Sequence, residues 1–321
     1  MSIIEDGEYN NFNEILRNAR ELEVKASQLH RARVQTLGGL LKPSDFGMET
    51  VDNQTYAYVS PKDSLGRNYT IVSVPKKDIK TLESVSDYLM KAWDTNKPEA
   101  TASELITILD MGGIVLAANC DGEMIGANQV LAGRDSDNQP ALISDQLAVS
   151  PDHRSHSIGR IMKQLVFCRA LEQDTTRVYV TFDPRRQNLW NLNVERLGGK
   201  IVGFEENKYG AHLLGAFNPE DLPTDRVIVL WDLLDPFTLN RIHNPRNGIR
   251  IEGVDLVEKP ISFGDDEQAF IQRRQLLGQM LRDHIIVGIT QDGILQFAPR
   301  SDYRVWGETL PRYLSGFTLK S

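Results

Sequence analysis

One stretch, residues 141–174, constrains the fold more than any other part of the chain. It opens with ALISDQLAV (141–149), a mostly apolar run that is typical of a buried strand. Pro151 ends this strand, because proline lacks a backbone donor and disfavours helix at the residue before it. After a polar loop (152–157), apolar residues recur every three or four positions, as on one face of a helix. The stretch therefore predicts a strand, a polar loop and a helix.

The start of this helix has the chemistry of an anion site. The first turn of a helix leaves backbone N–H groups without partners, and the helix dipole places positive charge there. Ser155, Ser157 and Gly159 are small enough to let a phosphate approach, and Arg154 and Arg160 add charge. An ordinary strand–loop–helix connection with solvated arginines has the same spacing. The residues alone leave both interpretations open.

The run VSPDHRSHSIGRIM (149–162) resembles the acetyl-CoA signature of the GNAT acyltransferase superfamily. It departs from that signature at Ser157, where the family usually has its first glycine. The likeness continues through the strand at 177–183 and the helix at 188–199, and covers roughly residues 68–210. Three further runs, TFDP (181–184), RLGG (196–199) and DRVIVLWDL (225–233), resemble a less-characterised group of predicted GNAT acetyltransferases with a C-terminal extension.

The order of predicted elements is that of a mixed α/β sheet flanked by helices, and the resemblance implies the GNAT fold. We predict helices at 11–41, 78–94, 101–111, 157–174, 187–197 and 265–284. We predict strands at 55–60, 68–74, 114–120, 123–133, 141–149, 177–183, 200–206, 225–233, 248–258, 285–290 and 294–298. We expect hairpin turns at Asp121-Gly122 and at 291–293, and a capping box from Thr101 to Glu104. The strand at 225–233 is expected to close the sheet.

The chain of 321 residues is long enough for more than one domain. We expect an N-terminal helical extension (1–66), a GNAT acyltransferase core (67–234) and a C-terminal α/β extension (235–321). Whether the last part is a separate domain or a wall of the acceptor pocket stays open.

Composition narrows the class of protein. Hydrophobic residues make up 40% and charged residues 25% of the chain, as in a globular protein, and no apolar run is long enough to span a membrane. The N-terminus lacks a signal-peptide pattern, and Cys120 and Cys168 both lie in apolar runs, so we expect buried inert thiols and a cytoplasmic location. The net charge of −8 argues against nucleic acid or an anionic membrane as partner. A homodimer stays open.

The resemblance implies a site for acyl-CoA. We expect no metal site, because no cluster of His, Cys or carboxylate residues in the sequence has metal-ligand spacing. In the GNAT fold the central strand parts from its neighbour beyond a bulge, and the thioester lies in the opening. The backbone of Leu147, Ala148 and Val149 would pair with the pantetheine arm, and the Val149 N–H would polarise the thioester carbonyl. The pyrophosphate would bind the backbone N–H groups of Arg154, Ser155, His156, Ser157, Ile158, Gly159 and Arg160.

Several side chains keep two interpretations. Arg154 either contacts the pyrophosphate or only pins the loop, and Arg160 faces solvent or the adenosine 3′-phosphate. Asn188 either contacts the cofactor, as the resemblance implies, or caps a helix. Loop polarity explains His153 and His156, and packing explains Trp190.

The catalytic groups are less defined. The superfamily often has a tyrosine as general acid seven residues after that asparagine, but Glu195 stands there, so the acid is open and Tyr209 is a replacement candidate. Asp145 is the best-placed general base on the central strand, or else a hydrogen-bonded structural group.

These observations predict an N-acyltransferase, with acetyl-CoA as the default donor, that transfers an acyl group directly to an amine on a small molecule or a peptide. One alternative is a non-catalytic acyl-CoA-binding or sensing module. The other is an acyltransferase that modifies a peptide or carrier-protein partner with a longer acyl chain.

Overall fold

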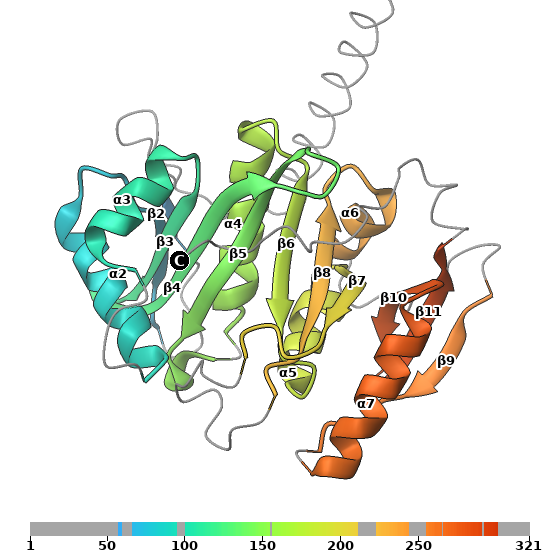
Figure 1. Cartoon of the computed structure of the whole chain (residues 1–321). Coiled ribbons are helices and arrows are strands. Elements are labelled where there is room, and N and C mark those ends of the chain that lie inside the picture. Colours follow the sequence, from blue (N-terminus) through green and yellow to red (C-terminus); the bar gives the residue numbers. More distant parts are fainter. Residues whose placement is uncertain are drawn as a thin grey trace, which may run out of the picture.

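The computed structural model describes residues 57–59, 66–94, 100–154, 156–210, 223–243, 255–264, 266–290 and 292–300. These residues form one eleven-stranded sheet with helices on both faces (Figure 1). The strands are β1 (Ala57–Val59), β2 (Tyr69–Ser73), β3 (Ile114–Cys120), β4 (Glu123–Arg134), β5 (Pro140–Val149), β6 (Arg177–Phe182), β7 (Lys200–Glu205), β8 (Arg226–Asp232), β9 (Val257–Pro260), β10 (His284–Ile289) and β11 (Ile294–Pro299). The helices are α2 (Ile79–Ala92), α3 (Ala102–Asp110), the 3₁₀ turn η2 (Pro151–His153), α4 (Ile158–Glu172), α5 (Gln187–Trp190), the π-helix η3 (Asn191–Arg196), α6 (Pro236–His243) and α7 (Glu267–Met280). The predicted mixed α/β sheet is confirmed.

The strand order is β1-β2-β3-β4-β5-β6-β8-β7-β10-β11-β9. Within the described strands, β5 and β6 pair in parallel, and every other neighbouring pair is antiparallel. The prediction that 225–233 closes the sheet is wrong, because β8 lies between β6 and β7. Apolar residues on both faces of β8 explain this position: Trp231 packs in the core on one face and Leu230 on the other.

Most predicted elements are present close to their predicted bounds. The capping box is confirmed, since Thr101 N–H donates to Glu104 Oε2 at 2.7 Å and Thr101 Oγ1 accepts from the Glu104 N–H. Both hairpins are confirmed. β9 begins at Val257 and includes the last two residues of the strand predicted at 248–258, of which 248–254 lie outside the described ranges. α6 was not predicted. The predicted helix at 11–41 and the residues after 300 lie outside the described ranges.

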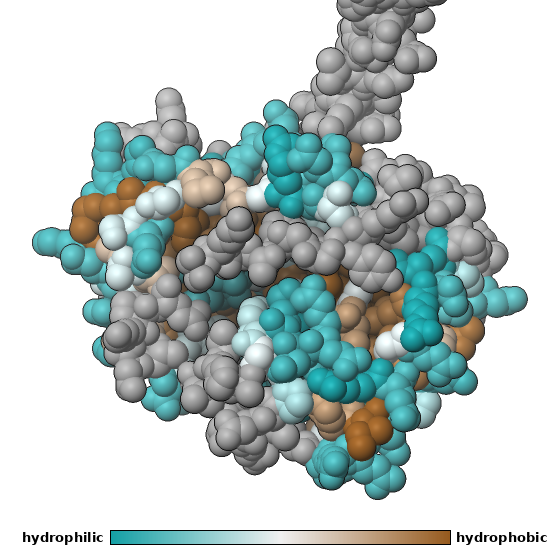
Figure 2. Space-filling view, in the orientation of Figure 1, coloured by the Kyte–Doolittle hydropathy of each residue, from teal (hydrophilic) through white to brown (hydrophobic). Residues whose placement is uncertain are grey.

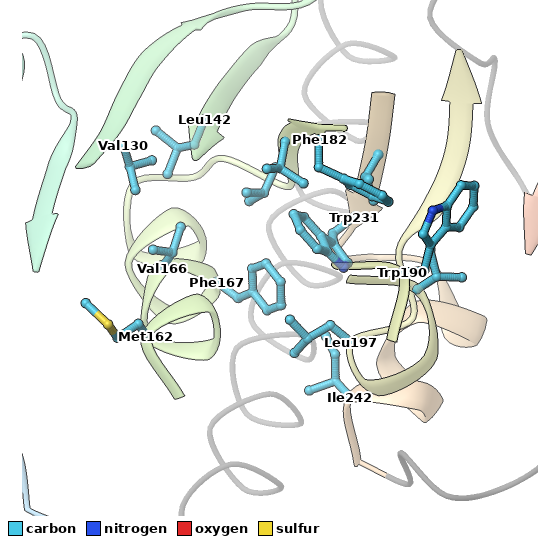
Figure 3. Close-up of a cluster of buried hydrophobic side chains, with 14 of the residues drawn as sticks. Val130, Leu142, Met162, Val166, Phe167, Phe182, Trp190, Leu197, Trp231 and Ile242 are labelled. Carbon is cyan, nitrogen blue, oxygen red and sulfur yellow. The ribbon is translucent and has the colours of Figure 1, made fainter. Parts of the chain in front are cut away.

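The two faces of the sheet carry separate hydrophobic clusters. Helices α2 and α3 cover one face over β3 and β4, and α4 covers the other (Figure 1). In the larger cluster, Phe167 of α4 packs on Trp231 with ring centroids 5.2 Å apart (Figure 3). Trp190 is fully buried and its indole N–H donates to the Pro184 carbonyl at 2.9 Å, so it is a packing residue.

Both cysteines are free and buried, as expected. Burial raises the pKa of the Cys168 thiol to about 12, so this thiol is inert at neutral pH.

The surface on the α2–α3 side is mostly hydrophilic where the structure describes it, with apolar side chains gathered near these two helices (Figure 2). Among the described residues, no helix has both the length and the apolar character needed to cross a membrane.

The C-terminal extension continues the sheet and shares the core. β10 pairs with β7 at Ile286 and Ile201, and Phe297 of β11 belongs to the same buried cluster as α4. Glu195 of η3 ties the two parts together. Its carboxylate accepts from Arg241 of α6 at 2.7 Å and from the backbone N–H of Ile289 at 2.9 Å.

We therefore predict that Glu195→Ala lowers the free energy of unfolding by about 2 kcal/mol, because it removes a charged partner from the buried Arg241 guanidinium. Chemical denaturation measures this loss. The control is Glu172→Ala, which removes the more exposed pair with Arg169 and costs less than about 0.5 kcal/mol. Equal losses in the two variants would contradict the role of Glu195.

Candidate functional site

The sheet opens between β5 and β6. Parallel pairing runs from Ala141–Arg177 to Ile143–Tyr179, and β5 then continues to Val149 paired with β4 alone. At the same point β5 carries a bulge. The β4 partners of Ser144 and Gln146 are adjacent residues, so Asp145 is the extra residue and its side chain is exposed. The bulge and the opening therefore coincide at Asp145.

Backbone groups of β5 point into this opening. The Ser150 N–H donates to the Ile125 carbonyl of β4 at 2.8 Å. Because hydrogen-bonded and non-bonded pairs alternate along an antiparallel ladder, Ala148 also bonds to β4, whereas Leu147 and Val149 direct their N–H and C=O groups away from it. This corrects the expectation for Ala148, whose backbone groups are used inside the sheet.

The loop after β5 turns back through a left-handed residue. Ser157 has φ of +63° and stands at the N-cap of α4, a conformation that glycine adopts most easily. Ser157 therefore adopts here the backbone conformation that a glycine at this position would take most easily. Ser155 lies outside the described residues.

His156 fastens the loop to the start of β2. Its Nε2 lies 2.9 Å from a guanidinium nitrogen of Arg67, and its Nδ1 lies 2.9 Å from the Arg154 carbonyl. Its ring centroid lies 5.7 Å from that of Tyr69, which also contacts His153 at 5.9 Å. Both histidines therefore hold the loop, which agrees with their interpretation as loop residues.

The first turn of α4 lies directly against the end of β5. A Cβ on Gly159 would lie 3.7 Å from Leu147 Cδ2 and 3.9 Å from Val149 Cγ2. Ile158 is buried in the core beside them. The unpaired N–H groups of the α4 N-terminus and the outward backbone groups of β5 are thus adjacent.

The two arginines of this region differ in position. Arg154 is exposed, and its Nε donates to the Val149 carbonyl at 3.2 Å, so it pins the loop to the strand. Arg160 is half-buried and points to the end of α6, where it donates to the Ile242 carbonyl at 3.4 Å. Burial and nearby Arg196 lower its pKa. This contact with α6, a helix that was not predicted from the sequence, gives the Arg160 side chain a structural partner, and the expectation that it faces solvent or a 3′-phosphate stays a prediction.

Asn188 is exposed in the short helix α5, whose N-cap is Arg186. The capping interpretation is thus not supported, and contact with a cofactor stays a prediction.

Asp145 lies on β5 at the opening, and Tyr209 contacts the neighbouring strand β6. Gln129 Nε2 donates to Asp145 Oδ2 at 3.3 Å. The Tyr209 hydroxyl lies 3.4 Å from Thr181 Oγ1 on β6, two residues beyond Tyr179, the last β6 residue paired with β5. Arg226 lies over the Tyr209 ring at 5.1 Å. Glu195, which stands where the family often has its tyrosine, binds Arg241 and the Ile289 N–H of the C-terminal extension.

Asp183, at the end of β6, is a structural group. It accepts from the Arg185 backbone at 2.9 Å and pairs with the Arg185 guanidinium at 2.6 Å. Burial acts to raise the pKa of Asp183, but these hydrogen bonds outweigh it and lower the pKa. In the described part of the chain no group of three or more His, Cys, Asp and Glu side chains could hold a metal ion.

Sequence reasoning missed two residues along β5, one beside its C-terminal end and one behind the bulge. Tyr88 of α2 donates its hydroxyl to the Ile125 carbonyl at 2.7 Å, and burial raises its pKa to about 12. Lys163 of α4 is 1% exposed, and its Nζ donates to Ser144 Oγ at 2.6 Å. Its pKa is lowered to about 7 by burial, which the charge of Asp145 partly opposes. The sequence carried no signal for Lys163, because a lysine outside the apolar stripe of a helix is expected to face solvent. In the structure α4 is buried on nearly all sides, and Lys163 is buried with it.

Comparisons with known proteins give the following. No family model matches the chain, and no curated protein matches it. Among solved structures, it is similar to an N-acetyltransferase from Staphylococcus aureus Mu50 (18% identity, 52% of this chain and 99% of that chain, TM-score 0.41). It is also similar to a GNAT-family acetyltransferase from Streptococcus pneumoniae (17% identity, 50% of this chain and 98% of that chain, TM-score 0.39). A third similar structure is a GNAT-family acetyltransferase from Elizabethkingia anophelis with acetyl-CoA bound (14% identity, 51% of this chain and 97% of that chain, TM-score 0.38). The motif of the sequence resembles the same superfamily.

The buried amine predicts a pH dependence of stability. The folded state binds fewer protons than the unfolded state between pH 7 and the ordinary lysine value of 10.5, so the free energy of unfolding rises with pH over this interval and is lowest below pH 7. The change is on the order of 5 kcal/mol. We predict that Lys163→Met removes this rise and is more stable than the wild type at pH 6 by at least about 1 kcal/mol.

Urea denaturation of the wild type and of Lys163→Met at pH 6, 8 and 9.5 measures the difference between their free energies of unfolding. The contributions of titrating groups that the two proteins share cancel in this difference. A difference in stability that does not change with pH would contradict the prediction.

Proposed function

We propose that the chain is a GNAT N-acyltransferase that transfers an acyl group from acyl-CoA directly to an amine. The observation that carries the proposal is the opening of the sheet at Asp145, where the outward backbone groups of Leu147 and Val149 lie beside the N-terminus of α4. An extended pantetheine arm can pair with such strand groups as an added strand would. The N–H groups of Ser157, Ile158, Gly159 and Arg160 at the start of α4 are suited to a pyrophosphate, whereas the Arg154 N–H donates to the Pro151 carbonyl at 3.2 Å.

In the proposed reaction the acceptor nitrogen attacks the thioester carbonyl, and the Val149 N–H stabilises the oxyanion of the tetrahedral intermediate. Asp145, directly or through water, takes the proton that the nitrogen loses as the C–N bond forms. The C–S bond then breaks, and the thiolate of CoA receives a proton from Tyr209, next to β6. The products are an amide and free CoA.

Acetyl-CoA is the proposed donor, and a longer acyl-CoA is a second option. The proposed acceptor is an amine of a small molecule or a peptide, and the proposed location is the cytoplasm, given two free buried cysteines. A non-catalytic acyl-CoA-binding module is the second candidate function. The observation that favours it is the structural use of Glu195, which leaves the family's acid position without an acid at the opening.

The binding site is tested by isothermal titration with acetyl-CoA. We predict that the wild type binds, that Gly159→Glu abolishes binding because it places bulk and negative charge at the start of α4, and that Gly159→Ala still binds. Alanine is a matched control, because its Cβ would be in ordinary van der Waals contact with Leu147. No binding by the wild type would contradict the proposed function.

The roles of Asp145 and Tyr209 are tested once an acceptor amine is found by thiol-release screening. We predict that Asp145→Asn lowers kcat by about 100-fold and removes the acidic limb of the pH profile, and that Tyr209→Phe lowers kcat by about 10-fold. Acetyl-CoA affinity should stay unchanged in both variants. Binding without turnover on any amine would favour the non-catalytic module.

A further inference from the structure

The buried amine of Lys163 lies directly behind the bulge. α4 packs on β3, β4 and β5, and Lys163 leaves the helix toward the sheet rather than toward solvent. Its Nζ lies 2.6 Å from Ser144 Oγ, on the residue that precedes Asp145. We propose that Lys163 is a positioning residue that holds the bulge from the α4 side of the sheet through Ser144, and so sets the place and charge environment of Asp145.

Hydrogen bonds continue from Lys163 into the neighbouring strand. Ser144 Oγ accepts from Lys163 and donates to Asn128 Oδ1 of β4 at 3.1 Å. Lys163, Ser144 and Asn128 are all buried, at 1%, 1% and 0% exposure. Burying three polar groups in an apolar core costs free energy of desolvation, and breaking one of their hydrogen bonds would leave a buried group unpaired. The geometry of the three groups is therefore held tightly once the bonds form.

A second contact holds the same bulge on β4. Gln129, the next residue of that strand, donates to the Asp145 carboxylate. The two adjacent residues Asn128 and Gln129 therefore each bind one of the two adjacent bulge residues, Ser144 and Asp145. We call these four residues together with Lys163 the bulge clamp.

Asp145 is the charged group that acts on Lys163 from the elements packed against it. β4 presents the neutral amide of Asn128, and β8 presents the ring of Trp231, whose centroid lies 5.2 Å from Nζ. Within the described residues, no carboxylate lies within ion-pair distance of Lys163. The amine and the Asp145 carboxylate therefore influence each other's protonation across the bulge.

The presence of a lysine at position 163 is not explained by packing alone. A methionine of similar length would fill the same space without the cost of burying an amine, so the lysine breaks a rule of core design. Such exceptions are expected where a site needs them. A protonated Lys163 stabilises the carboxylate form of Asp145, and its deprotonation makes Asp145 easier to protonate.

The catalytic part of this proposal rests on the proposed function, but the coupling between Lys163 and Asp145 does not. We therefore test the coupling first, by NMR titration of the full chain with ¹³C-labelled lysine. The Lys163 signal is assigned from its absence in Lys163→Met. We expect a midpoint near pH 7, well below the ordinary lysine value of 10.5.

In Asp145→Asn the Lys163 midpoint should fall by about half a pH unit or more, because the attraction that favours the ammonium form is lost. Ser144→Ala should also move the midpoint, since it removes the hydroxyl that accepts from Nζ. A Lys163 midpoint above 9, or a midpoint that Asp145→Asn does not move, would overturn the proposal.

The positioning role is then tested by a double-mutant cycle in the transfer assay. We expect Lys163→Met to lower kcat by about 10-fold, to move the acidic limb of the pH profile and to leave KM for acyl-CoA unchanged. In the Asp145→Asn background, Lys163→Met should cost nothing further. The control, Lys76→Met, removes an exposed lysine and should change neither kcat nor the pH profile.

Multiplicative losses in the double variant would show that Lys163 acts only through general stability, and would overturn the positioning role. A wild type that does not bind acetyl-CoA would overturn the proposed function, and in that case the NMR titration still decides whether the clamp exists.

Discussion

The bulge at Asp145 is the constraint on which the site depends. One extra residue in β5 breaks the regular alternation of the strand. Beyond it, β5 stays with β4 while β6 no longer follows, so a central strand of a large sheet has one free side. Backbone hydrogen-bonding groups in the middle of a sheet are normally paired, so the outward groups at Leu147 and Val149 take partners from outside the sheet, and the Val149 carbonyl already accepts from Arg154.

The elements around the opening supply both rigidity and positive potential. The left-handed Ser157 turns the chain so that α4 starts against the end of β5, and Arg154 and His156 tie the loop to β5 and to Arg67. The site is thus built on strand and helix ends whose positions the core fixes, which is what a catalytic or binding geometry needs.

The C-terminal extension changes what the core residues do. Glu195 and Arg160 stand at positions where the resemblance implies roles in or near the site, yet both contact the extension: Glu195 binds Arg241 and the Ile289 N–H, and Arg160 binds the Ile242 carbonyl. The strands of the extension join the same sheet and the same buried cluster. These contacts show why motif positions transferred from smaller domains can acquire a structural role in a longer chain.

Local patterns were enough to predict the capping box at Thr101, both hairpins and the strand–loop–helix unit, because each depends on residues close together in the sequence. The order of strands was not predictable in this way, since β8 lies between β6 and β7 through contacts between distant segments. The same holds for the site. The motif located the loop, and Asp145 was chosen as the best-placed carboxylate on the central strand. The bulge, the direction of the Val149 N–H and the burial of Lys163 depend on how β4, β5 and α4 pack together. The sequence by itself determined most of the helices, strands and turns, because their patterns are local, although α6 was not predicted. The tertiary structure alone decided which backbone groups point out of the sheet and which charge is buried, because both depend on contacts between distant segments.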